Sequence, residues 1–245
     1  MTTQALAGKH CVVSGVTSGI GRASVERLIA EQAFVVGLAR DSERLAQMQT
    51  ELGPRFRPLN VDLAIVAQVL ELSAALQKLA PRVDVFISNA AECAYVSPLE
   101  AQPADLERWF QVNVLSPIAL CRAIAPLMPA GAQIVQLSSV TARWFANAKF
   151  GPYAATKAAA ETLFEALRLE LHPRDIHVSV LAPGLVATPI YDKVPNFSRA
   201  RAKLESEIPT WLSAGDVADA IIWMLSRPAH VVVSELVMMP SKQTR

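Results

Sequence analysis

Tyr153 and Lys157 are the residues whose types and spacing point most directly to chemistry in this chain. Residues at positions i and i+4 share one face of a helix, so the lysine ammonium group would lie beside the tyrosine phenol. A free tyrosine titrates near pH ~10, and a close cation lowers such a pKa by about 1–3 units. The pair is therefore suited to general acid–base catalysis, although the same spacing also occurs in ordinary amphipathic helices. Ser139, which follows an apolar run upstream, could hold a carbonyl oxygen beside the phenol.

A glycine-rich turn near the N-terminus supplies a second pattern. Residues 9–14 have the composition of a short buried strand, and Gly15, Gly19 and Gly21 follow it, with a helical pattern over residues 20–30. Strand, glycine turn and helix form the opening of a dinucleotide-binding unit, because glycine lets the backbone approach a pyrophosphate and a helix N-terminus attracts it. The spacing is G-x-x-x-G-x-G instead of the standard G-x-G-x-x-G, and a glycine turn without a ligand is the alternative.

Together with two further segments, these patterns resemble the motifs of the short-chain dehydrogenase/reductase family, in that family's order along the chain. Residues 14–21 resemble its T-G-x-x-x-G-x-G loop, residues 88–91 its N-N-A-G segment, and residues 183–188 its P-G-x-x-x-T segment. The similarity runs along nearly the whole chain. It implies the fold of that family and an NAD(P)-dependent oxidoreductase that acts on CH–OH groups.

Departures from the family motifs are few. Serine stands for threonine at position 14 and for asparagine at position 88, and alanine stands for glycine at position 91. These positions mainly support backbone geometry, so we expect cofactor binding to survive. The segment between Ser139 and Tyr153 is about one residue longer than is usual for the family. We interpret this as a loop insertion that leaves Ser139 catalytic, and the alternative is that Ser138 faces the substrate.

The resemblance implies a role for each motif residue. The tyrosine would exchange a proton with the substrate oxygen, and the lysine would lower the tyrosine pKa and hold the nicotinamide ribose. The serine would bind the substrate oxygen, and the asparagine would support a water that links the lysine to solvent. The catalytic residues would be Asn113, Ser139, Tyr153 and Lys157. The cofactor would contact Gly15, Thr17, Ser18, Gly19, Ile20, Gly21, Arg40, Asp62, Leu63, Asn89, Ala90, Tyr153, Lys157, Pro183, Gly184, Val186 and Thr188.

The choice between NADP and NAD is expected to depend on the end of the second strand. NAD enzymes place an acidic residue there for the ribose 2′-hydroxyl, whereas an arginine suits a 2′-phosphate. Ala39 occupies the position of the acid, and Arg40 follows it with a guanidinium that can bind phosphate bidentately. We therefore predict NADP(H), with a solvated Arg40 as the alternative. Asp41 could reach the ribose but more naturally begins a helix, and Asp62 resembles the family's adenine-contacting aspartate.

The elements that must position these residues follow from alternating apolar runs and helical patterns. The predicted strands cover residues 11–14, 34–39, 56–61, 83–88, 133–137, 177–181 and 231–238. The predicted helices cover residues 20–30, 42–52, 65–79, 103–128, 153–171 and 216–225, and Pro117 and Pro126 are expected to kink the fourth. This alternation predicts an α/β fold, a Rossmann-like doubly wound parallel sheet of seven strands with helices on both faces. The whole chain, residues 1–245, would form one domain, with the four motifs meeting at the carboxyl ends of the strands.

Composition narrows the class of protein further. With 52% apolar residues and a net charge of +1, the chain gives no reason to expect nucleic acid or a membrane surface as a partner. We see no uninterrupted apolar run near ~18 residues and no signal peptide pattern. Three scattered cysteines suit a reducing cytoplasm, and four dispersed histidines have no metal-ligand spacing. We expect a cytoplasmic protein without a metal.

Substrate recognition is assigned to three variable segments. Tyr95, Arg143, Trp144, Phe145 and Tyr191 are the candidate substrate residues, and residues 189–211 resemble the family's mobile lid. The aromatic pair at positions 144 and 145 favours an apolar or ring-bearing substrate, with simple packing as the alternative, and the arginine could receive a carboxylate.

Three functions are compatible with the sequence. The first is an NADP(H)-dependent reductase of a small aldehyde, ketone or 3-oxo acid. The second is an NAD(P)-dependent dehydrogenase of an alcohol or 3-hydroxy acid in catabolism. Residues 234–240 resemble the ending of a branch of the family that holds both 3-hydroxy acid (serine) dehydrogenases and clavulanate-type aldehyde reductases. The third is a non-catalytic NADP-binding sensor, which the intact catalytic set argues against. By analogy with the family, helices 103–128 and 153–171 would form a homodimer or homotetramer.

Overall fold

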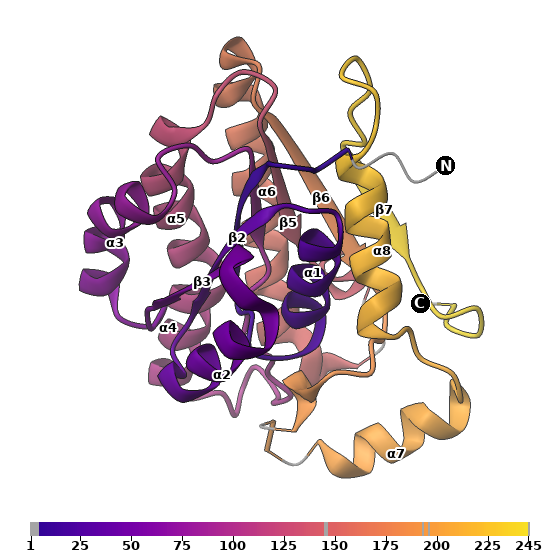
Figure 1. Cartoon of the computed structure of the whole chain (residues 1–245). Coiled ribbons are helices and arrows are strands. Elements are labelled where there is room, and N and C mark those ends of the chain that lie inside the picture. Colours follow the sequence, from indigo (N-terminus) through magenta and orange to yellow (C-terminus); the bar gives the residue numbers. More distant parts are fainter. Residues whose placement is uncertain (1–4, 145–146, 193, 196, 245) are drawn as a thin grey trace.

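A parallel sheet of seven strands forms the centre of the protein (Figure 1). The computed structural model describes residues 5–144, 147–192, 194–195 and 197–244. The strands lie in the order β3-β2-β1-β4-β5-β6-β7, so the winding direction reverses between β1 and β4. Their bounds are β1 His10–Ser14, β2 Phe34–Ala39, β3 Phe56–Asn60, β4 Val85–Ser88, β5 Gln133–Leu137, β6 His177–Pro183 and β7 Glu235–Met238. The predicted doubly wound sheet is confirmed, and its reversal point is where such folds bind ligands.

Helices cover both faces of the sheet, and each face has its own apolar core (Figure 1). Leu28 and Phe56 are fully buried on one face, and Phe86 and Phe164 on the other. The first face packs against α1 Gly19–Ala30, α2 Ser42–Leu52 and α8 Ala214–Leu225. The second packs against α3 Val66–Leu79, α5 Ser116–Ile124 and α6 Gly151–Leu171. Strands buried on two faces need apolar side chains at successive positions, which explains the apolar runs in the sequence.

The predicted helix over residues 103–128 is interrupted. It consists of α4 Pro103–Phe110, a π-helical turn at Gln111–Leu115, α5, and a 3₁₀ turn at Ala125–Leu127. Pro117 lacks the N–H that would donate to the preceding turn, and the ladder widens just before it. This confirms an interruption near Pro117 and places Asn113 inside the π-helical turn.

By length and composition alone, the stretch Pro103–Leu127 could cross a membrane. Polar residues interrupt its apolar ones, so the stretch contains no uninterrupted apolar run of about 18 residues. The core helix of a soluble protein has the same properties, and here Leu120, Cys121 and Ile124 are buried against the sheet.

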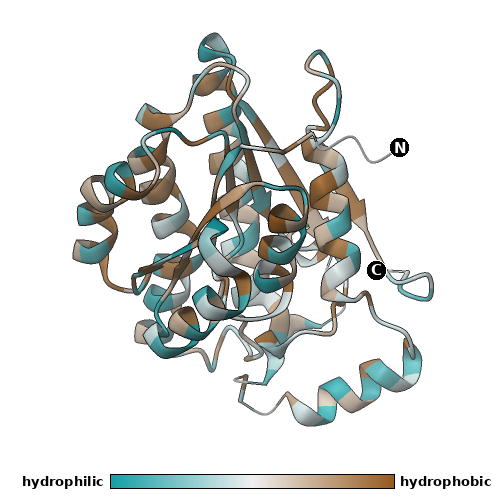
Figure 2. Cartoon of the chain, in the orientation of Figure 1, coloured by the Kyte–Doolittle hydropathy of each residue, from teal (hydrophilic) through white to brown (hydrophobic). Residues whose placement is uncertain are grey.

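Two differences from the predicted elements lie near the C-terminus. β7 begins at Glu235, four residues later than predicted, because Val231 turns back to donate its N–H to Pro228. A further helix, α7 Ser198–Glu207, lies in the segment predicted as a polar lid. Figure 2 shows α7 as a mostly hydrophilic helix at the edge of the molecule.

Candidate active site

A glycine cradle connects the end of β1 with the start of α1. Gly15 and Gly19 have φ angles of +71° and +53°, which glycine adopts without strain. A Cβ atom on Gly21 would lie 2.2 Å from the carbonyl oxygen of Gly15, so only glycine fits there. Asn89 closes the cradle because its Nδ2 donates to the carbonyl oxygens of Ser14 and Gly15 at 2.9 and 3.1 Å.

Ser14 explains why serine is tolerated in place of the family's threonine. Its hydroxyl oxygen accepts hydrogen bonds from the backbone N–H groups of Asn89 and Ala90, both at 3.0 Å. The residue therefore ties the end of β1 to the segment after β4, and it is the hydroxyl that performs this task.

A cavity of about 970 Å³ lies over the carboxyl ends of β1, β2 and β4. Cofactor and ligand sites usually have volumes of roughly 300–1,000 Å³. Most of the cofactor residues predicted from the sequence line it, namely Gly15, Thr17, Ser18, Gly19, Ile20, Arg40, Asp62, Leu63, Asn89, Ala90 and Thr188.

The cradle fits a pyrophosphate. Ser18 is the N-cap of α1, and among the described residues its side chain makes no capping hydrogen bond to the helix. The first N–H groups of α1, which lie at the positive end of the helix dipole, are therefore not capped by the Ser18 side chain. Because Gly15 and Gly19 have no side chains, a phosphate can approach these N–H groups from the cavity.

Six predicted cofactor residues lie outside the set of described residues that line the cavity, namely Gly21, Tyr153, Lys157, Pro183, Gly184 and Val186. Pro183 ends β6 and is aligned with Met238 of β7, and Gly184 donates its N–H to the same residue. Val186 is buried and forms a parallel bridge with Leu212. These positions brace the segment that carries Thr188 to the glycine loop, where its Cγ2 would lie 3.1 Å from a Cβ on Gly19.

Arg40 lies at the rim of the cavity, directly after β2. Asn60 holds its backbone by donating to the carbonyl oxygens of Ala39 and Arg40 at 3.3 and 3.0 Å. The guanidinium Nη1 lies 3.5 Å from Oε1 of Glu92. Asp41 caps α2 by accepting the N–H of Arg44 at 2.9 Å, which confirms that it begins this helix.

Tyr153 and Lys157 lie in the first turns of α6, as their spacing predicted. Lys157 is 2% exposed, and its Nζ donates to the backbone carbonyl of Leu137 at the end of β5, at 2.8 Å. The same Nζ lies 5.8 Å from the centroid of the Tyr153 ring. The hydrogen bond to β5 therefore holds the ammonium group against the sheet and near the phenol.

The pKa of Tyr153 is shifted in the direction opposite to the one expected. Burial of the phenol raises its pKa well above 10, nearby Cys93 and Tyr191 add to this, and a hydrogen bond with Ser139 opposes it. Burial also lowers the pKa of Lys157 from 10.5 to about 8, against the influence of Cys93 and Glu161. Loss of hydration is the largest cause of the Tyr153 shift, so the phenol carries its proton at neutral pH, as an exposed tyrosine also does.

Ser139 lies between β5 and the start of α6. Its Oγ accepts hydrogen bonds from the N–H and the hydroxyl of Thr141, at 3.2 and 2.9 Å. Its own proton is therefore directed elsewhere, and its hydroxyl lies close enough to the phenol to oppose the rise in the pKa of Tyr153. Ser138 is buried, and its hydroxyl has no hydrogen-bond partner among the described residues. This geometry favours Ser139 over Ser138 as the residue beside the phenol.

Asn113 is 1% exposed and faces the loop that follows β4. Its Oδ1 accepts the N–H of Glu92, and its Nδ2 donates to the carbonyl of Glu92, both at 2.8 Å. The same Nδ2 donates to the hydroxyl of Thr156 at 3.0 Å, which in turn donates to the carbonyl of Tyr153. Asn113 thus joins the rim of the cavity to the helix that carries the tyrosine.

An aromatic cluster connects the lid to the rest of the site. Phe197 is 1% exposed and stacks on Tyr191, with ring centroids 4.9 Å apart. It also meets Tyr95 and Phe150 edge to face, at 5.1 and 5.9 Å. Tyr95 lines the cavity, so two of the predicted substrate residues, Tyr95 and Tyr191, come together here.

The other predicted substrate residues do not join this cluster. Arg143 is directed to Glu161 of α6 and Glu235 of β7, with nitrogen–oxygen distances of 3.3 and 3.1 Å. Trp144 is 42% exposed and lies outside the described lining of the cavity. Phe145 lies outside the described residues.

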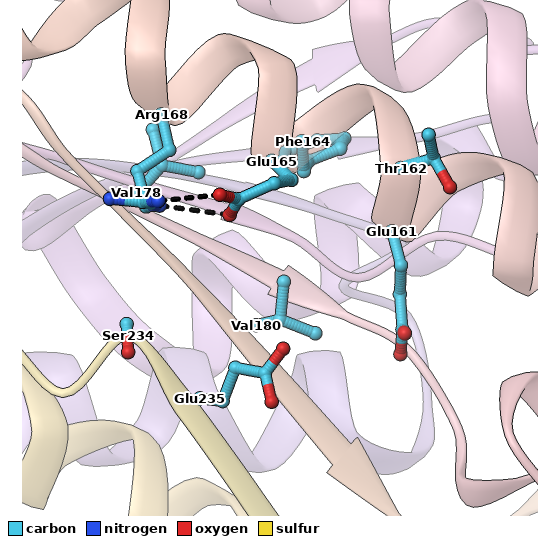
Figure 3. Close-up of a pocket in the computed structure, with 9 residues that line it drawn as sticks. All are labelled: Glu161, Thr162, Phe164, Glu165, Arg168, Val178, Val180, Ser234 and Glu235. Carbon is cyan, nitrogen blue, oxygen red and sulfur yellow. Dashed lines mark hydrogen bonds and ion pairs between the residues drawn. The ribbon is translucent and has the colours of Figure 1, made fainter.

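The two carboxylates that Arg143 contacts, Glu161 and Glu235, line a smaller cavity of about 290 Å³ (Figure 3). Glu161, Glu165 and Arg168 project toward it from α6, and Glu235 from the start of β7. Arg168 forms an ion pair with Glu165 there. The four catalytic candidates are absent from the described lining of both cavities. Cys93, which lines the large cavity, acts on the pKa of both Tyr153 and Lys157, so we place the chemistry beside the large cavity.

Several residues of the site were not found from the sequence. Arg108 of α4 lines the cavity and binds Glu92 bidentately, at 2.9 and 2.7 Å. Phe150 joins the aromatic cluster from just before α6. Both contacts are between residues far apart in sequence, so periodicity could not reveal them. The one available signal in the sequence was the cationic residue Arg108 in the helix after the N-N-A-G segment.

Comparisons with known proteins agree with this geometry. A family model described as short chain dehydrogenase matches residues 9–198. A probable NADP-dependent dehydrogenase of Haemophilus influenzae is 29% identical over 240 residues, 95% of this chain and 94% of that protein. The NADP-dependent 3-hydroxy acid dehydrogenase of Escherichia coli K12 is 29% identical over 238 residues, 95% of each chain.

Solved structures resemble the chain over nearly its whole length. The closed form of serine dehydrogenase complexed with NADP+ gives a TM-score of 0.87 at 26% identity and covers 96% of both chains. A short-chain dehydrogenase from Burkholderia cenocepacia in complex with NADP gives a TM-score of 0.85 at 25% identity, over 95% of this chain and 96% of that one.

The segment matched by the family model begins one residue before β1 and ends at the first residue of α7. It therefore contains the glycine cradle together with Asn113, Ser139, Tyr153 and Lys157. The chain belongs to the short-chain dehydrogenase family.

Proposed function

We propose that this protein is an NADP(H)-dependent oxidoreductase that reduces a small aldehyde, ketone or 3-oxo acid to the alcohol. The observation that carries the proposal is the placement of Tyr153 and Lys157 on α6 with the ammonium group held 5.8 Å from the phenol ring, because a phenol beside a cation can pass a proton to a carbonyl oxygen. The names of the relatives, which include NADP-dependent dehydrogenases, support the cofactor and the reaction class.

The residues around the large cavity would hold the cofactor. The glycine cradle and the N-terminus of α1 would bind the pyrophosphate, and Arg40 would bind the 2′-phosphate. Asp62 and Leu63 would border the adenine, while Thr188 and the backbone near Val186 would orient the nicotinamide carboxamide. When bound, the nicotinamide supplies the hydride.

The chain's own part in the reaction is to position and protonate the substrate oxygen. Ser139, whose oxygen already accepts two hydrogen bonds, would donate its proton to that oxygen. Tyr153 would donate the proton that completes the alcohol. Lys157, with a pKa of about 8, would be mostly charged at pH 7 and would stabilise the phenolate that remains. Asn113 would support a water that links Lys157 to solvent.

A second candidate is oxidation of a 3-hydroxy acid with the same residues. The specific observation that favours it is the similarity to the Escherichia coli NADP-dependent 3-hydroxy acid dehydrogenase over 95% of both chains. In that direction Tyr153 would accept the proton of the alcohol. Its raised pKa makes this step less favourable near neutral pH and easier at alkaline pH.

We further propose that residues 189–211 act as a lid over the substrate. Phe197, Tyr191 and Tyr95 form an apolar wall next to the cavity, which suits an apolar or ring-bearing part of a substrate. Arg143 is engaged by two carboxylates, so we do not assign it a substrate carboxylate.

We also propose that the protein is a homodimer or homotetramer. Leu115, Leu163 and Leu169 expose 55, 39 and 64% of their surface on the π-helical turn and on α6. Exposed leucines on these helices support a homodimer or homotetramer that covers them. We place the protein in the cytoplasm, without nucleic acid or membrane as a partner.

One experiment tests this function. The purified protein is titrated with NADPH and NADH, and NADPH oxidation is then followed across aldehydes, ketones and 3-oxo acids, with NADP+ reduction by 3-hydroxy acids as the reverse assay. Tighter binding of NADPH with turnover of a carbonyl compound is the expected result. Turnover by 3-hydroxy acids alone would favour the second candidate, and binding without any turnover would contradict both.

A further inference from the structure

Three charged side chains that line the large cavity, those of Arg40, Glu92 and Arg108, contact one another. Arg40 follows β2 and Glu92 lies four residues after β4, while β1 lies between these strands in the sheet. The 3.5 Å ion pair between Arg40 Nη1 and Glu92 Oε1 therefore spans the end of β1, above the glycine cradle. Arg108 of α4 binds the same carboxylate through two hydrogen bonds, 2.9 Å to Oε2 and 2.7 Å to the Oε1 that Arg40 also contacts.

The two arginines are unequal partners of Glu92. Arg108 makes a bidentate contact, the stronger geometry for a guanidinium and a carboxylate, whereas the Arg40 contact is single and longer. The backbone of Glu92 is fixed by Asn113, so its carboxylate moves between the arginines only by rotation of its side chain. Arg40 and Arg108 are about half exposed, which leaves both free to adjust.

A carboxylate at this place competes with phosphate. Carboxylate and phosphate oxygens are the same kind of acceptor for a guanidinium, and a phosphate monoester carries about 1.5 to 2 negative charges at pH 7. Glu92 contacts Arg40, the arginine directly after β2, so it both occupies a donor of Arg40 and repels an incoming phosphate.

We propose that Glu92 is a built-in competitor for Arg40 that limits the preference for a 2′-phosphorylated cofactor, and that Arg108 strengthens this preference by drawing the carboxylate away. This inference rests on the proposed NADP(H) function and names the residues that tune it. Glu92 and Arg108 are positioning residues here, because they act through Arg40.

The proposal predicts opposite effects for two charge-removing substitutions. Glu92→Gln frees Arg40 and removes the repulsion, so NADPH binds about two- to fivefold more tightly while NADH binding changes little. Arg108→Gln releases the carboxylate toward Arg40, so NADPH binds about two- to fivefold more weakly, again with little change for NADH. These factors correspond to the usual strength of partly exposed ion pairs.

The test measures dissociation constants by isothermal titration calorimetry with NADPH, NADH, adenosine 2′,5′-bisphosphate and adenosine 5′-monophosphate. The last two probes isolate the 2′-phosphate from the nicotinamide, and turnover is not needed. Glu100→Gln is the matched control, because Glu100 also lines the cavity mouth and loses the same charge. It should leave the ratio of NADPH to NADH affinity within about twofold.

The double variant Glu92→Gln with Arg108→Gln separates this mechanism from direct phosphate binding by Arg108. With the carboxylate gone, loss of Arg108 should change NADPH affinity by less than about twofold, whereas a direct contact would keep its full effect. Shifts of equal sign in the two single variants, or equal shifts for NADPH and NADH, would overturn the proposal. The proposed function fails separately, if the unaltered protein does not bind NADPH more tightly than NADH.

Discussion

The side chain of Asn113 holds the peptide of Glu92 through two hydrogen bonds, both 2.8 Å long. Through Thr156 the same side chain reaches the backbone of Tyr153. One buried amide therefore fixes the loop at the cavity rim relative to the catalytic helix.

Replacing Asn113 with alanine should destabilise the protein. The substitution leaves the N–H and C=O of Glu92 without their partner in a part-buried place, and each such loss costs about 1–3 kcal/mol. Urea denaturation followed by circular dichroism measures the change. Asn60→Ala is the control, because this exposed amide also donates to backbone carbonyls and should cost less than about 1 kcal/mol. Equal costs for the two variants would contradict the role of Asn113.

The buried Lys157 should make stability depend on pH in a defined window. Its pKa is lowered from 10.5 to about 8 in the folded protein, so between these values the unfolded chain binds the proton and the folded one does not. Burial of the charge then costs stability below pH 8, and this cost is relieved as the pH rises toward 10.5. The shift corresponds to roughly 3 kcal/mol.

Lys157→Met provides the measurement for this prediction. The free energy of unfolding of the natural protein should rise relative to that of the variant by a few kcal/mol between pH 7 and pH 10.5. The comparison cancels the titration of other groups. A difference that stays constant over this range would show that the lysine has an ordinary pKa in the folded state.

Gly21→Ala should abolish the cofactor cradle. The new Cβ would lie 2.2 Å from the carbonyl oxygen of Gly15 and 2.6 Å from Nδ2 of Asn89, so the turn must move. We expect a loss of about 2–3 kcal/mol in stability and at least tenfold weaker NADPH binding. Gly53→Ala is the control, because φ is +72° there and a Cβ meets open space among the described residues. It should cost about 1 kcal/mol and leave NADPH binding unchanged.

Phe197→Ala should open the lid. The ring is 1% exposed and packs on Tyr191, Tyr95 and Phe150, and removal of a buried phenylalanine costs about 3–5 kcal/mol. The loss should appear as local opening, detected as at least tenfold faster tryptic cleavage within α7. Leu204→Ala, in the half-buried part of α7, is the matched control and should accelerate cleavage less. Equal acceleration would mean that the aromatic cluster does not hold the lid.

Most of the sheet could be predicted because its strands are buried on both faces and read as apolar runs. Helix α7 could not be predicted in this way, since it has no apolar face. Ion pairs one turn apart support it, Arg201 with Glu205 at 2.9 Å and Lys203 with Glu207 at 3.7 Å, by about 0.2–0.5 kcal/mol each. The sequence pattern was interpreted as a polar loop because charges, not apolar residues, mark this helix.

Local motifs predicted those parts of the site that are built from residues close together in the sequence. They did not predict the parts that depend on contacts between distant residues. The glycine cradle and the Tyr153–Lys157 pair follow from spacing along one turn or one helix. Arg143 was assigned to the substrate, but its partner Glu235 is 92 positions away and could not be foreseen. The pKa of Tyr153 likewise depends on burial by the whole fold, which spacing does not report.

The most direct test of the proposed function is NADPH oxidation by the Tyr153→Phe variant, with a carbonyl compound that the natural protein reduces. Phenylalanine keeps the ring and removes the proton donor, so kcat should fall by about 10²–10⁴-fold while the dissociation constant of NADPH stays within about twofold. Tyr95→Phe is the control, because its hydroxyl accepts a hydrogen bond from Asn147 at 3.1 Å and is assigned no proton transfer. A Tyr153→Phe variant with near-normal kcat would contradict the assignment of Tyr153 as the proton donor.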